Sequence, residues 1–318
     1  MATTTVEAEN LGKRFKDTTA LDRFDISAES GTVLGLLGPN GAGKTTTVRI
    51  LTTLLRLDTG RASVAGFDVA GDARQVRRRI GLAGQRTAVD DILTARQNLI
   101  LFGKLFRLNK AQAGARADEL LGRFGLADAA DRQPKRFSGG MKRRLDLAAS
   151  MILAPQVLFL DEPTTGLDPA GRHEVWDTVE SLAADGTTVV LTTHYLDEAD
   201  RLCDRIAVID HGRNIVEDTP AGLKRRMGAD RLEVVAADPA DLSAVAGVVA
   251  PLADGEVTTD ETAAAVSAPV AEPVAALTAA ATAVRDKNLT VADIGLRRPT
   301  LDEAFLELVG TTVKEDRP

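Results

Sequence analysis

The chain has 318 residues, of which 44% are hydrophobic, and a formal net charge of −7 at pH 7. This length suits one large domain and a smaller one. The acidic balance argues against a nucleic-acid partner held by bulk electrostatics, because such binding needs a basic surface that displaces counterions from phosphates. The single cysteine, Cys203, cannot form an internal disulfide and fits a reducing compartment.

The sequence predicts neither a secretory signal nor a membrane span. Residues 1–15 lack the basic and then apolar pattern of a signal peptide. The stretch nearest to a span, Val266–Val284, contains Glu272 and two prolines and is rich in alanine, which is weakly hydrophobic. We therefore expect any membrane role to come through a partner protein.

The first motif lies between a predicted strand and a predicted helix. Residues 32–38, TVLGLLG, are typical of a buried strand, and residues 45–55, TTTVRILTTLL, have apolar positions at helical spacing. Between them the sequence matches G-x-x-x-x-G-K-[ST], a loop whose backbone N–H groups hold phosphates. The residues expected to bind the nucleotide here are Gly38, Pro39, Asn40, Gly41, Ala42, Gly43, Lys44, Thr45 and Thr46.

A second motif follows a short apolar run. Val157–Leu160 predicts a buried parallel strand that ends at Asp161 and Glu162, where ligands of α/β sheets bind. Two adjacent acids in this position are costly without a cation. We expect Asp161 to hold Mg²⁺ through water while Thr45 ligates it directly, Lys44 to contact the β- and γ-phosphates, and Glu162 to orient or deprotonate the attacking water.

A third motif leads to a family resemblance. Ser138, Gly139 and Gly140 open an amphipathic helix, whose N-terminus is a ready anion site, although alone they would suit an ordinary N-cap and turn. With the other motifs, this loop makes residues 5–223 resemble an ATP-binding-cassette (ABC) ATPase domain, in which Met141 is usually Gln. The resemblance implies that the loop contacts the γ-phosphate of ATP held by a second copy, in a homodimer.

The resemblance also implies roles for four single residues. Gln85 takes the place of a glutamine that reaches the Mg²⁺ and the water and contacts the membrane partner. His194 takes the place of a switch histidine beside the γ-phosphate. Phe15 matches an aromatic that stacks on adenine, with a place in the hydrophobic core as the alternative. Asp168 matches a loop that communicates across the dimer.

A narrower likeness concerns exporters. The segments IGLAGQ, RFSGGMKRRLDLAASMI and RRPTLDEAFLELVG are similar to those of daunorubicin-resistance-type exporter ATPases, from which Arg86 and Ala95 depart. This likeness implies an ATP-hydrolysing subunit, peripheral on the cytoplasmic side of the membrane, that drives efflux of a drug or antibiotic-like compound through a separate permease. The alternatives are an importer ATPase and a soluble ABC protein acting on ribosomes or DNA.

The expected fold class is α/β with two domains. Up to about Leu223 apolar strands alternate with helical patterns, which favours a partly parallel sheet. The resemblance implies that residues 1–223 form a P-loop NTPase cassette with a mixed sheet and a helical subdomain at about 86–155. A glycine break and a shift in composition precede a separate domain, residues 224–318.

The C-terminal domain has a regular pattern of predicted strands and helices, but no motif that predicts a catalytic role. Its pattern is βαββαβ, which suggests a small ferredoxin-like unit. A last helix, Thr300–Gly310, begins with capping-box spacing from Thr300 to Glu303. Its apolar stripe must bury against its own domain, the cassette or a second copy, and consists of Leu301, Ala304, Phe305 and Leu308.

Overall fold

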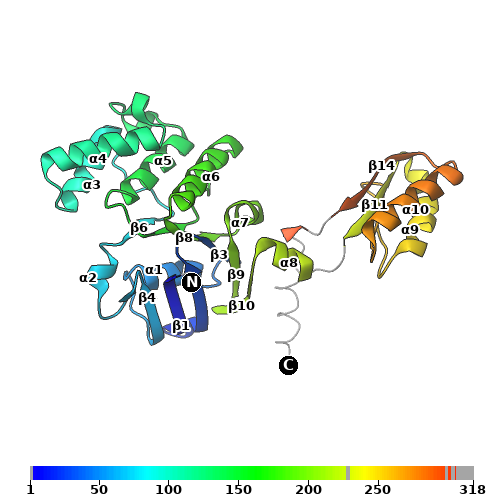
Figure 1. Cartoon of the computed structure of the whole chain (residues 1–318), viewed down its shortest axis with the longest axis horizontal. Helices are drawn as coiled ribbons and strands as arrows, with labels where there is room; N and C mark the ends of the chain where they lie inside the picture. The colour runs from blue at the N-terminus through cyan, green and yellow to red at the C-terminus, as the bar shows by residue number, and fades with distance from the viewer. Residues whose placement is uncertain (1–2, 227–229, 298–299, 302–304, 306–318) are drawn as a thin grey trace. The chain divides into compact units, whose positions relative to one another are not determined.

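A computed structural model describes residues 3–226, 230–297, 300, 301 and 305. The chain divides into two compact units, Met1–Pro220 and Ala221–Pro318 (Figure 1). Each unit has a hydrophobic core of its own. The domain boundary expected at residue 223 falls inside α8 (Pro220–Arg226). The expected helix Thr300–Gly310 lies outside the described residues except at Thr300, Leu301 and Phe305.

A mixed six-stranded sheet forms the centre of the first unit, which confirms the α/β class expected for the cassette. Five strands are parallel, and β10 joins one edge antiparallel to β9. Strands β3, β7 and β8 are buried along their whole length, as strands covered on both faces require. The order is β10 (Arg213–Asp218), β9 (Arg205–Asp210), β3 (Val33–Leu37), β8 (Thr188–Thr193), β7 (Val157–Asp161) and β6 (Ile80–Ala83).

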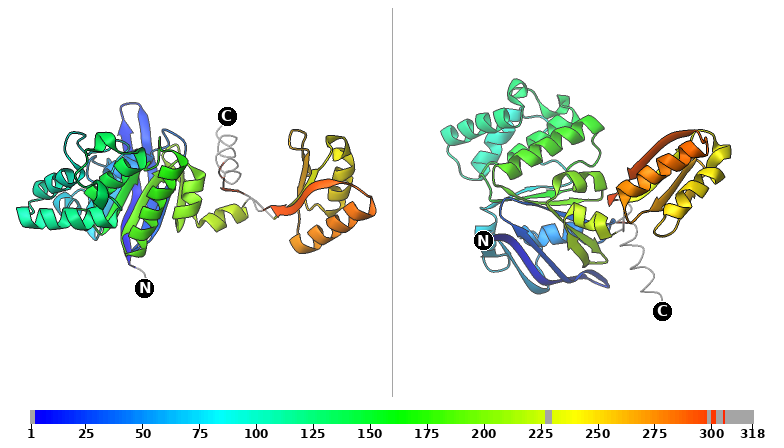
Figure 2. Two further views of the ribbon diagram at one scale, coloured as in Figure 1. Left: turned by 90° about the horizontal axis from the view of Figure 1, so that it is seen from above. Right: turned by 45° about the vertical axis from the view of Figure 1, so that its right-hand side comes forward.

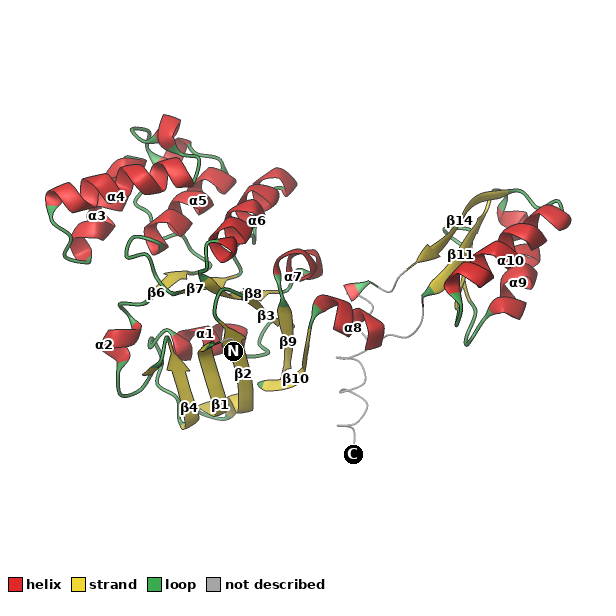
Figure 3. Cartoon of the chain, in the orientation of Figure 1, coloured by secondary structure: helices red, strands yellow, loops and turns green. Residues whose placement is uncertain are grey.

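A second, antiparallel sheet packs into the same core through α1 (Lys44–Leu51). Figure 3 shows α1 next to strands of both sheets. This helix is shorter than the predicted 45–55, because Thr53 has a φ of +63° and leaves the helical conformation. The order of the second sheet is β2 (Thr18–Glu29), β1 (Thr4–Phe15), β4 (Thr59–Val64) and β5 (Phe67–Asp68).

The remaining helices of the first unit follow β5. Helices α3 and α4 each begin with a capping box, Thr94 with Gln97 and Asn109 with Gln112, which satisfies free backbone N–H groups at both helix starts. These two helices and α5 lie together at one end of the unit (Figure 1). The helices are α2 (Ala73–Val76), α3 (Ala95–Leu105), α4 (Lys110–Arg123), α5 (Gly139–Ser150), α6 (Pro169–Ala184) and α7 (Leu196–Leu202), with short 3₁₀ turns at Ala127–Ala129 and Pro134–Arg136.

The second unit is a four-stranded antiparallel sheet with two helices on it (Figure 2). The strand order is β12–β13–β11–β14, and residues from β11, β13, α9 and α10 share one apolar core. The chain order is β11 (Arg231–Ala236), α9 (Leu242–Val249), β12 (Thr258–Asp260), β13 (Ala265–Pro269), α10 (Pro273–Asp286) and β14 (Val291–Arg297), with 3₁₀ turns at Pro239–Asp241 and Ala250–Leu252.

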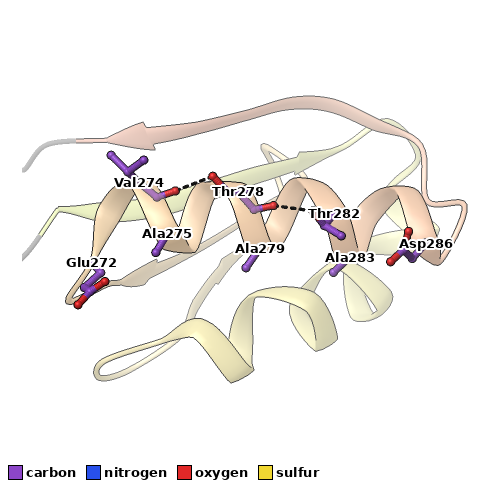
Figure 4. A pocket seen from close by; sticks show the side chains of 8 residues that line it. All are labelled: Glu272, Val274, Ala275, Thr278, Ala279, Thr282, Ala283 and Asp286. Carbon is purple, nitrogen blue, oxygen red and sulfur yellow. Dashed lines mark hydrogen bonds between the residues drawn. The ribbon is translucent and has the colours of Figure 1, made fainter.

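The outer face of α10 is lined by small side chains, among them Ala275 and Ala279 (Figure 4). The hydroxyl groups of Thr278 and Thr282 donate to the carbonyl oxygens of Val274 and Thr278 in the same helix. These hydroxyl donors are therefore satisfied within α10 itself. Among residues 3–226 and 230–297, no helix combines the length and apolarity needed to cross a bilayer.

Candidate nucleotide-binding and hydrolysis site

The carboxyl ends of four parallel strands meet at one edge of the central sheet. The strand register pairs Leu37 with Thr193 and Asp161 with Thr192, and places the end of β6 beside the end of β7. The glycine-rich loop follows β3, Asp161 and Glu162 close β7, and His194 follows β8. Topology alone therefore brings together side chains from distant parts of the sequence, at the edge where α/β sheets bind ligands.

The glycine-rich loop wraps around the side chain of Lys44. Its Nζ donates to the carbonyl oxygens of Gly38, at 2.7 Å, and Pro39, at 3.1 Å. Gly43 has a φ of +117°, and a Cβ atom there would lie 2.7 Å from the Ala20 carbonyl oxygen. Glycine is required at this position both for its backbone conformation and for the close approach.

Lys44 is only 5% exposed, and the carboxylates of Glu162 and Asp161 offset part of the free energy needed to bury its ammonium group. Burial lowers the pKa of Lys44, while the charges of Glu162 and Asp161 act in the opposite direction. Lys44 Nζ lies 4.0 Å from Glu162 Oε1. The two carboxylates therefore offset part of the cost of burying the ammonium group, which is the form that binds phosphate oxygens.

Asp161 is held by hydroxyl groups from two different elements. Thr45 Oγ1 lies 3.2 Å from each oxygen of the Asp161 carboxylate. Thr192 Oγ1 donates to Asp161 Oδ1 at 2.6 Å. Sequence reasoning missed Thr192, because only the strand register places its hydroxyl beside Asp161.

Glu162 has a backbone φ of +50°, which is unusual for a residue with a side chain of this size. Its backbone N–H donates to the carbonyl oxygen and the hydroxyl of Thr192, both at 3.1 Å, and these bonds hold the turn. The side chain, 12% exposed, places Oε1 3.5 Å from His194 Nδ1. Strained backbone that is fixed by its surroundings is common at functional sites.

His194 lies beside Glu162 and stacks against the ring of Tyr195, with 4.2 Å between ring centroids. Within the described chain, its Nδ1 atom is buried and makes no hydrogen bond. The structure thus groups Lys44, Thr45, Asp161, Glu162 and His194 in one cluster of side chains.

Ser138, Gly139 and Gly140 form a second cluster with Asp168. Ser138 Oγ caps α5 by accepting from the Met141 N–H at 3.2 Å, and Asp168 caps α6 by accepting from the Gly171 N–H at 2.8 Å. A Cβ atom at Gly140 would lie 3.0 Å from the Gly171 Cα atom, so the two helix starts are in close contact. Among the described residues, no hydrogen bond or ion pair joins this cluster to the Lys44 cluster.

Gln85 and Phe15 stand apart from both clusters. Gln85 is exposed in the loop that follows β6. Phe15 ends β1 and is 45% exposed, with Lys13 Nζ 5.5 Å from the centre of its ring. The alternative of a core position for Phe15 is therefore wrong, and its π-face is accessible.

Glu198 of α7 is a further buried acid that the sequence did not single out. Its Oε1 accepts from the Thr164 hydroxyl at 2.7 Å and from Trp176 Nε1 at 3.0 Å. Burial raises the pKa of Glu198, and these hydrogen bonds oppose the shift. Glu198 thereby connects α7, α6 and the segment that follows Glu162.

Comparisons with known proteins agree with this geometry. Residues 21–165 match a family model described as "ABC transporter". The chain is 61% identical to the daunorubicin resistance ATP-binding protein DrrA2 of Streptomyces coeruleorubidus over 96% of this chain and 95% of that protein. It is 40% identical to the Nod factor export ATP-binding protein I of Sinorhizobium fredii over 98% and 87% of the two chains.

Solved structures show the same fold for the first unit. The ATP-binding subunit of an ABC transporter is similar with a TM-score of 0.62 and 28% identity, over 71% of this chain and 94% of that one. An ATP-binding cassette in its ADP conformation gives a TM-score of 0.63 and 26% identity, over 68% and 91%. The phosphate loop, the carboxylates at the sheet edge and these relatives together establish that the chain is an ATP-hydrolysing member of the ABC transporter ATP-binding family.

Proposed function

We propose that the chain uses Mg²⁺-dependent ATP hydrolysis to drive efflux of a drug or antibiotic-like compound through a separate membrane permease. The observation that carries the proposal is the cluster at the sheet edge, where Glu162 lies next to both Lys44 and His194. The relatives support the direction of transport, since they are named for daunorubicin resistance and for Nod factor export. None of these names points to an importer or to a protein acting on ribosomes or DNA.

The donor set at Asp161 fits Mg²⁺, which prefers a few hard oxygen ligands and completes its shell with water and phosphate. Thr45 Oγ1 is equally distant from both Asp161 oxygens, so a hydroxyl and a carboxylate already converge. In the described ranges, no three His, Cys, Asp or Glu side chains gather into a metal-binding group. We infer that Thr45 and Asp161, with Gln85 from the loop after β6, hold the ion together with the nucleotide.

Lys44, Glu162 and His194 would each have a separate role in ATP hydrolysis. Lys44 neutralises charge on the β- and γ-phosphates, and bound Mg²⁺ would supply further neutralisation of the phosphate oxygens. Glu162, whose carboxylate lies beside Lys44 and His194, would accept a proton from the attacking water. His194 Nδ1, buried beside Glu162 without a hydrogen bond in the described chain, is placed to orient Glu162 or the γ-phosphate.

Two copies of the chain would complete each nucleotide site. Ser138 is exposed at the start of α5, and its cluster with Asp168 makes no polar contact with the Lys44 cluster in the described part of the chain. A partner copy could bring its Ser138 N-terminus to the γ-phosphate, since a helix start favours anions. Phe15, with its accessible ring, would stack on the adenine.

A surface suited to the permease lies beside α3. The patch is built from exposed apolar side chains, and Leu54 and Phe106 from it also line a cavity of about 230 Å³. Exposed apolar groups that gather in this way mark interaction sites. We therefore place the permease contact, and with it a peripheral position on the cytoplasmic side of the membrane, at the apolar patch Leu54, Leu101, Leu105 and Phe106.

For the second unit we propose a ferredoxin-like accessory domain that steadies the dimer or the permease contact. The strand order β12–β13–β11–β14 and the chain order βαββαβ support this assignment. Its inner residues form a separate apolar core, so we expect residues 1–229 to fold and bind ATP without it.

Co-expression with a membrane subunit tests the proposal. The chain should co-purify with the permease, hydrolyse MgATP and support ATP-dependent efflux in vesicles. Phe106→Ser should reduce retention by the permease. Salt-sensitive RNA or DNA binding without any permease contact would instead favour a soluble ABC protein.

A further inference from the structure

Helix α5 holds the loop around Gln85 through two buried charged side chains. Arg143 Nη1 donates to the carbonyl oxygen of Gly84 at 2.6 Å, one residue before Gln85. Asp146 Oδ1 accepts from the backbone N–H of Ala88 at 2.8 Å, three residues after Gln85. The loop is thus attached to the same helix on both sides of Gln85.

The two charges also pair with each other, one helical turn apart. Arg143 Nη1 lies 3.1 Å from Asp146 Oδ2, and the residues are 4% and 3% exposed. Burial lowers the pKa of Arg143 and raises that of Asp146, while their mutual attraction opposes both shifts. Burying such a pair costs desolvation free energy, and apolar residues of similar size would often stabilise the protein equally well.

Unlike apolar side chains, this pair fixes the position of the loop backbone through hydrogen bonds. Its hydrogen bonds go to the groups of Gly84 and Ala88, neither of which belongs to a helix or strand. The negative charges of Asp146, Glu198 and Asp161 all act to keep the guanidinium charged. Arg143 therefore joins α5 to the backbone of the Gln85 loop.

We propose that Arg143 and Asp146 are positioning residues, which fix the Gln85 loop to α5 and so set where Gln85 lies relative to Asp161. The proposal rests on the role in Mg²⁺ binding proposed above for Gln85. Since α5 begins at Ser138, a shift of this helix on binding the nucleotide of a second copy would be passed to the Gln85 loop through the same two hydrogen bonds.

A spin label on the loop tests the proposal without relying on activity. Arg86→Cys places the label next to Gln85 at an exposed site. The chain's own Cys203 will not compete, because it is buried and burial raises the pKa of its thiol. Label mobility and the Mg²⁺ concentration for half-maximal ATP hydrolysis are measured on the same full-length, labelled protein.

Three variants are compared in this background, with circular dichroism as the check that each is folded. Asp146→Asn keeps the shape of the side chain and an acceptor for the Ala88 N–H, but leaves the Arg143 charge unpaired. Arg143→Gln removes the charge and keeps a donor. The double variant R143Q/D146N is a neutral pair that can still donate and accept.

We expect each single variant to increase label mobility and to raise the required Mg²⁺ concentration by about 10-fold, as loss of residues that orient metal ligands typically does. The double variant should recover part of both effects, because no unpaired charge is left buried. The matched control is Lys142→Ala. Lys142 of α5 pairs with Asp91, which follows the Gln85 loop, but this ion pair is more exposed than the Arg143–Asp146 pair. Its loss should therefore change neither label mobility nor the Mg²⁺ requirement.

Unchanged label mobility in folded Asp146→Asn and Arg143→Gln would overturn the proposal. So would an equal effect of Lys142→Ala, which would mean that any cation on α5 near the loop has the same influence. Increased mobility with an unchanged Mg²⁺ requirement would support the attachment of the loop to α5, and would show that Gln85 has no part in Mg²⁺ binding.

Discussion

Replacing Glu162 by Gln removes one charge from the middle of the Lys44 cluster and leaves the shape of the side chain intact. The amide can no longer accept a proton from water. General-base catalysis contributes about 10²–10⁴-fold, or about 3 to 5 kcal/mol of activation free energy. We expect the hydrolysis rate to fall by that factor.

Binding of ATP should survive the same substitution. Glu162 Oε1 lies 4.0 Å from Lys44 Nζ, a separation at which two unit charges interact by about 4 kcal/mol at an effective dielectric constant of 20. Losing this attraction frees the ammonium for phosphate oxygens and removes a negative charge that would repel them. The nucleotide affinity of Glu162→Gln should therefore equal or exceed that of the wild type.

The assay combines phosphate release under saturating MgATP with titration of a fluorescent ATP analogue. Gel filtration with MgATP should then show a dimer for the variant, because the unhydrolysed nucleotide holds two copies together. A wild-type hydrolysis rate in Glu162→Gln would remove this residue from the mechanism. Weaker nucleotide binding would refute the charge argument instead.

The other predictions concern single features of the site and the second unit. Lys44→Ala should weaken nucleotide binding along with catalysis, and an unchanged affinity in the fluorescence titration would contradict its contact with the phosphates. Thr192→Val removes the shortest hydrogen bond to Asp161, and should lower Mg²⁺ affinity by about 10-fold in a titration of hydrolysis against Mg²⁺. Burial raises the pKa of Glu198 above its ordinary value of 4.5, so its effect on stability is most favourable below pH 4.5 and is lost as the pH rises through the raised value. Glu198→Gln should accordingly flatten the fall of Tm with increasing pH, and identical slopes in the two proteins would argue against this cause. Truncation after residue 229 should leave ATP affinity intact but weaken dimerisation or permease contact; equal behaviour in all three measurements would leave the second unit without a role here.

The sequence predicted the α/β class and the chemistry of the sheet edge because each motif has a local cause. A glycine-rich loop between a strand and a helix binds phosphate wherever it occurs, and acids after a buried apolar strand lie at a fixed edge of the sheet. Strand order also brings His194 to Glu162, which no spacing in the sequence shows. The binding roles of these residues stay predictions until a nucleotide complex is measured.

Residues that act by holding others were beyond the sequence. Thr192 looks like any β-branched strand residue until the register places it beside Asp161. Arg143 and Asp146 look like charges on an amphipathic helix, where such residues usually face solvent. Their burial depends on where the loop after β6 crosses α5, which is a matter of tertiary packing.

The end of α1 has a similar explanation. The apolar spacing predicted a helix to residue 55, but Thr53 adopts a left-handed conformation and the chain turns toward β4. A helical period continues to match for a few residues beyond the point where the helix stops, so apolar spacing alone does not locate its end.

Phosphate release from ATP as a function of Mg²⁺ tests the central claim most directly. The account predicts saturable hydrolysis by the purified chain that disappears with EDTA and returns when Mg²⁺ is restored, with Asp161→Asn requiring more Mg²⁺ than the wild type. Hydrolysis that persists at full rate in EDTA, or a Mg²⁺ requirement unaffected by Asp161→Asn, would contradict a Mg²⁺-dependent ATPase site at this edge of the sheet.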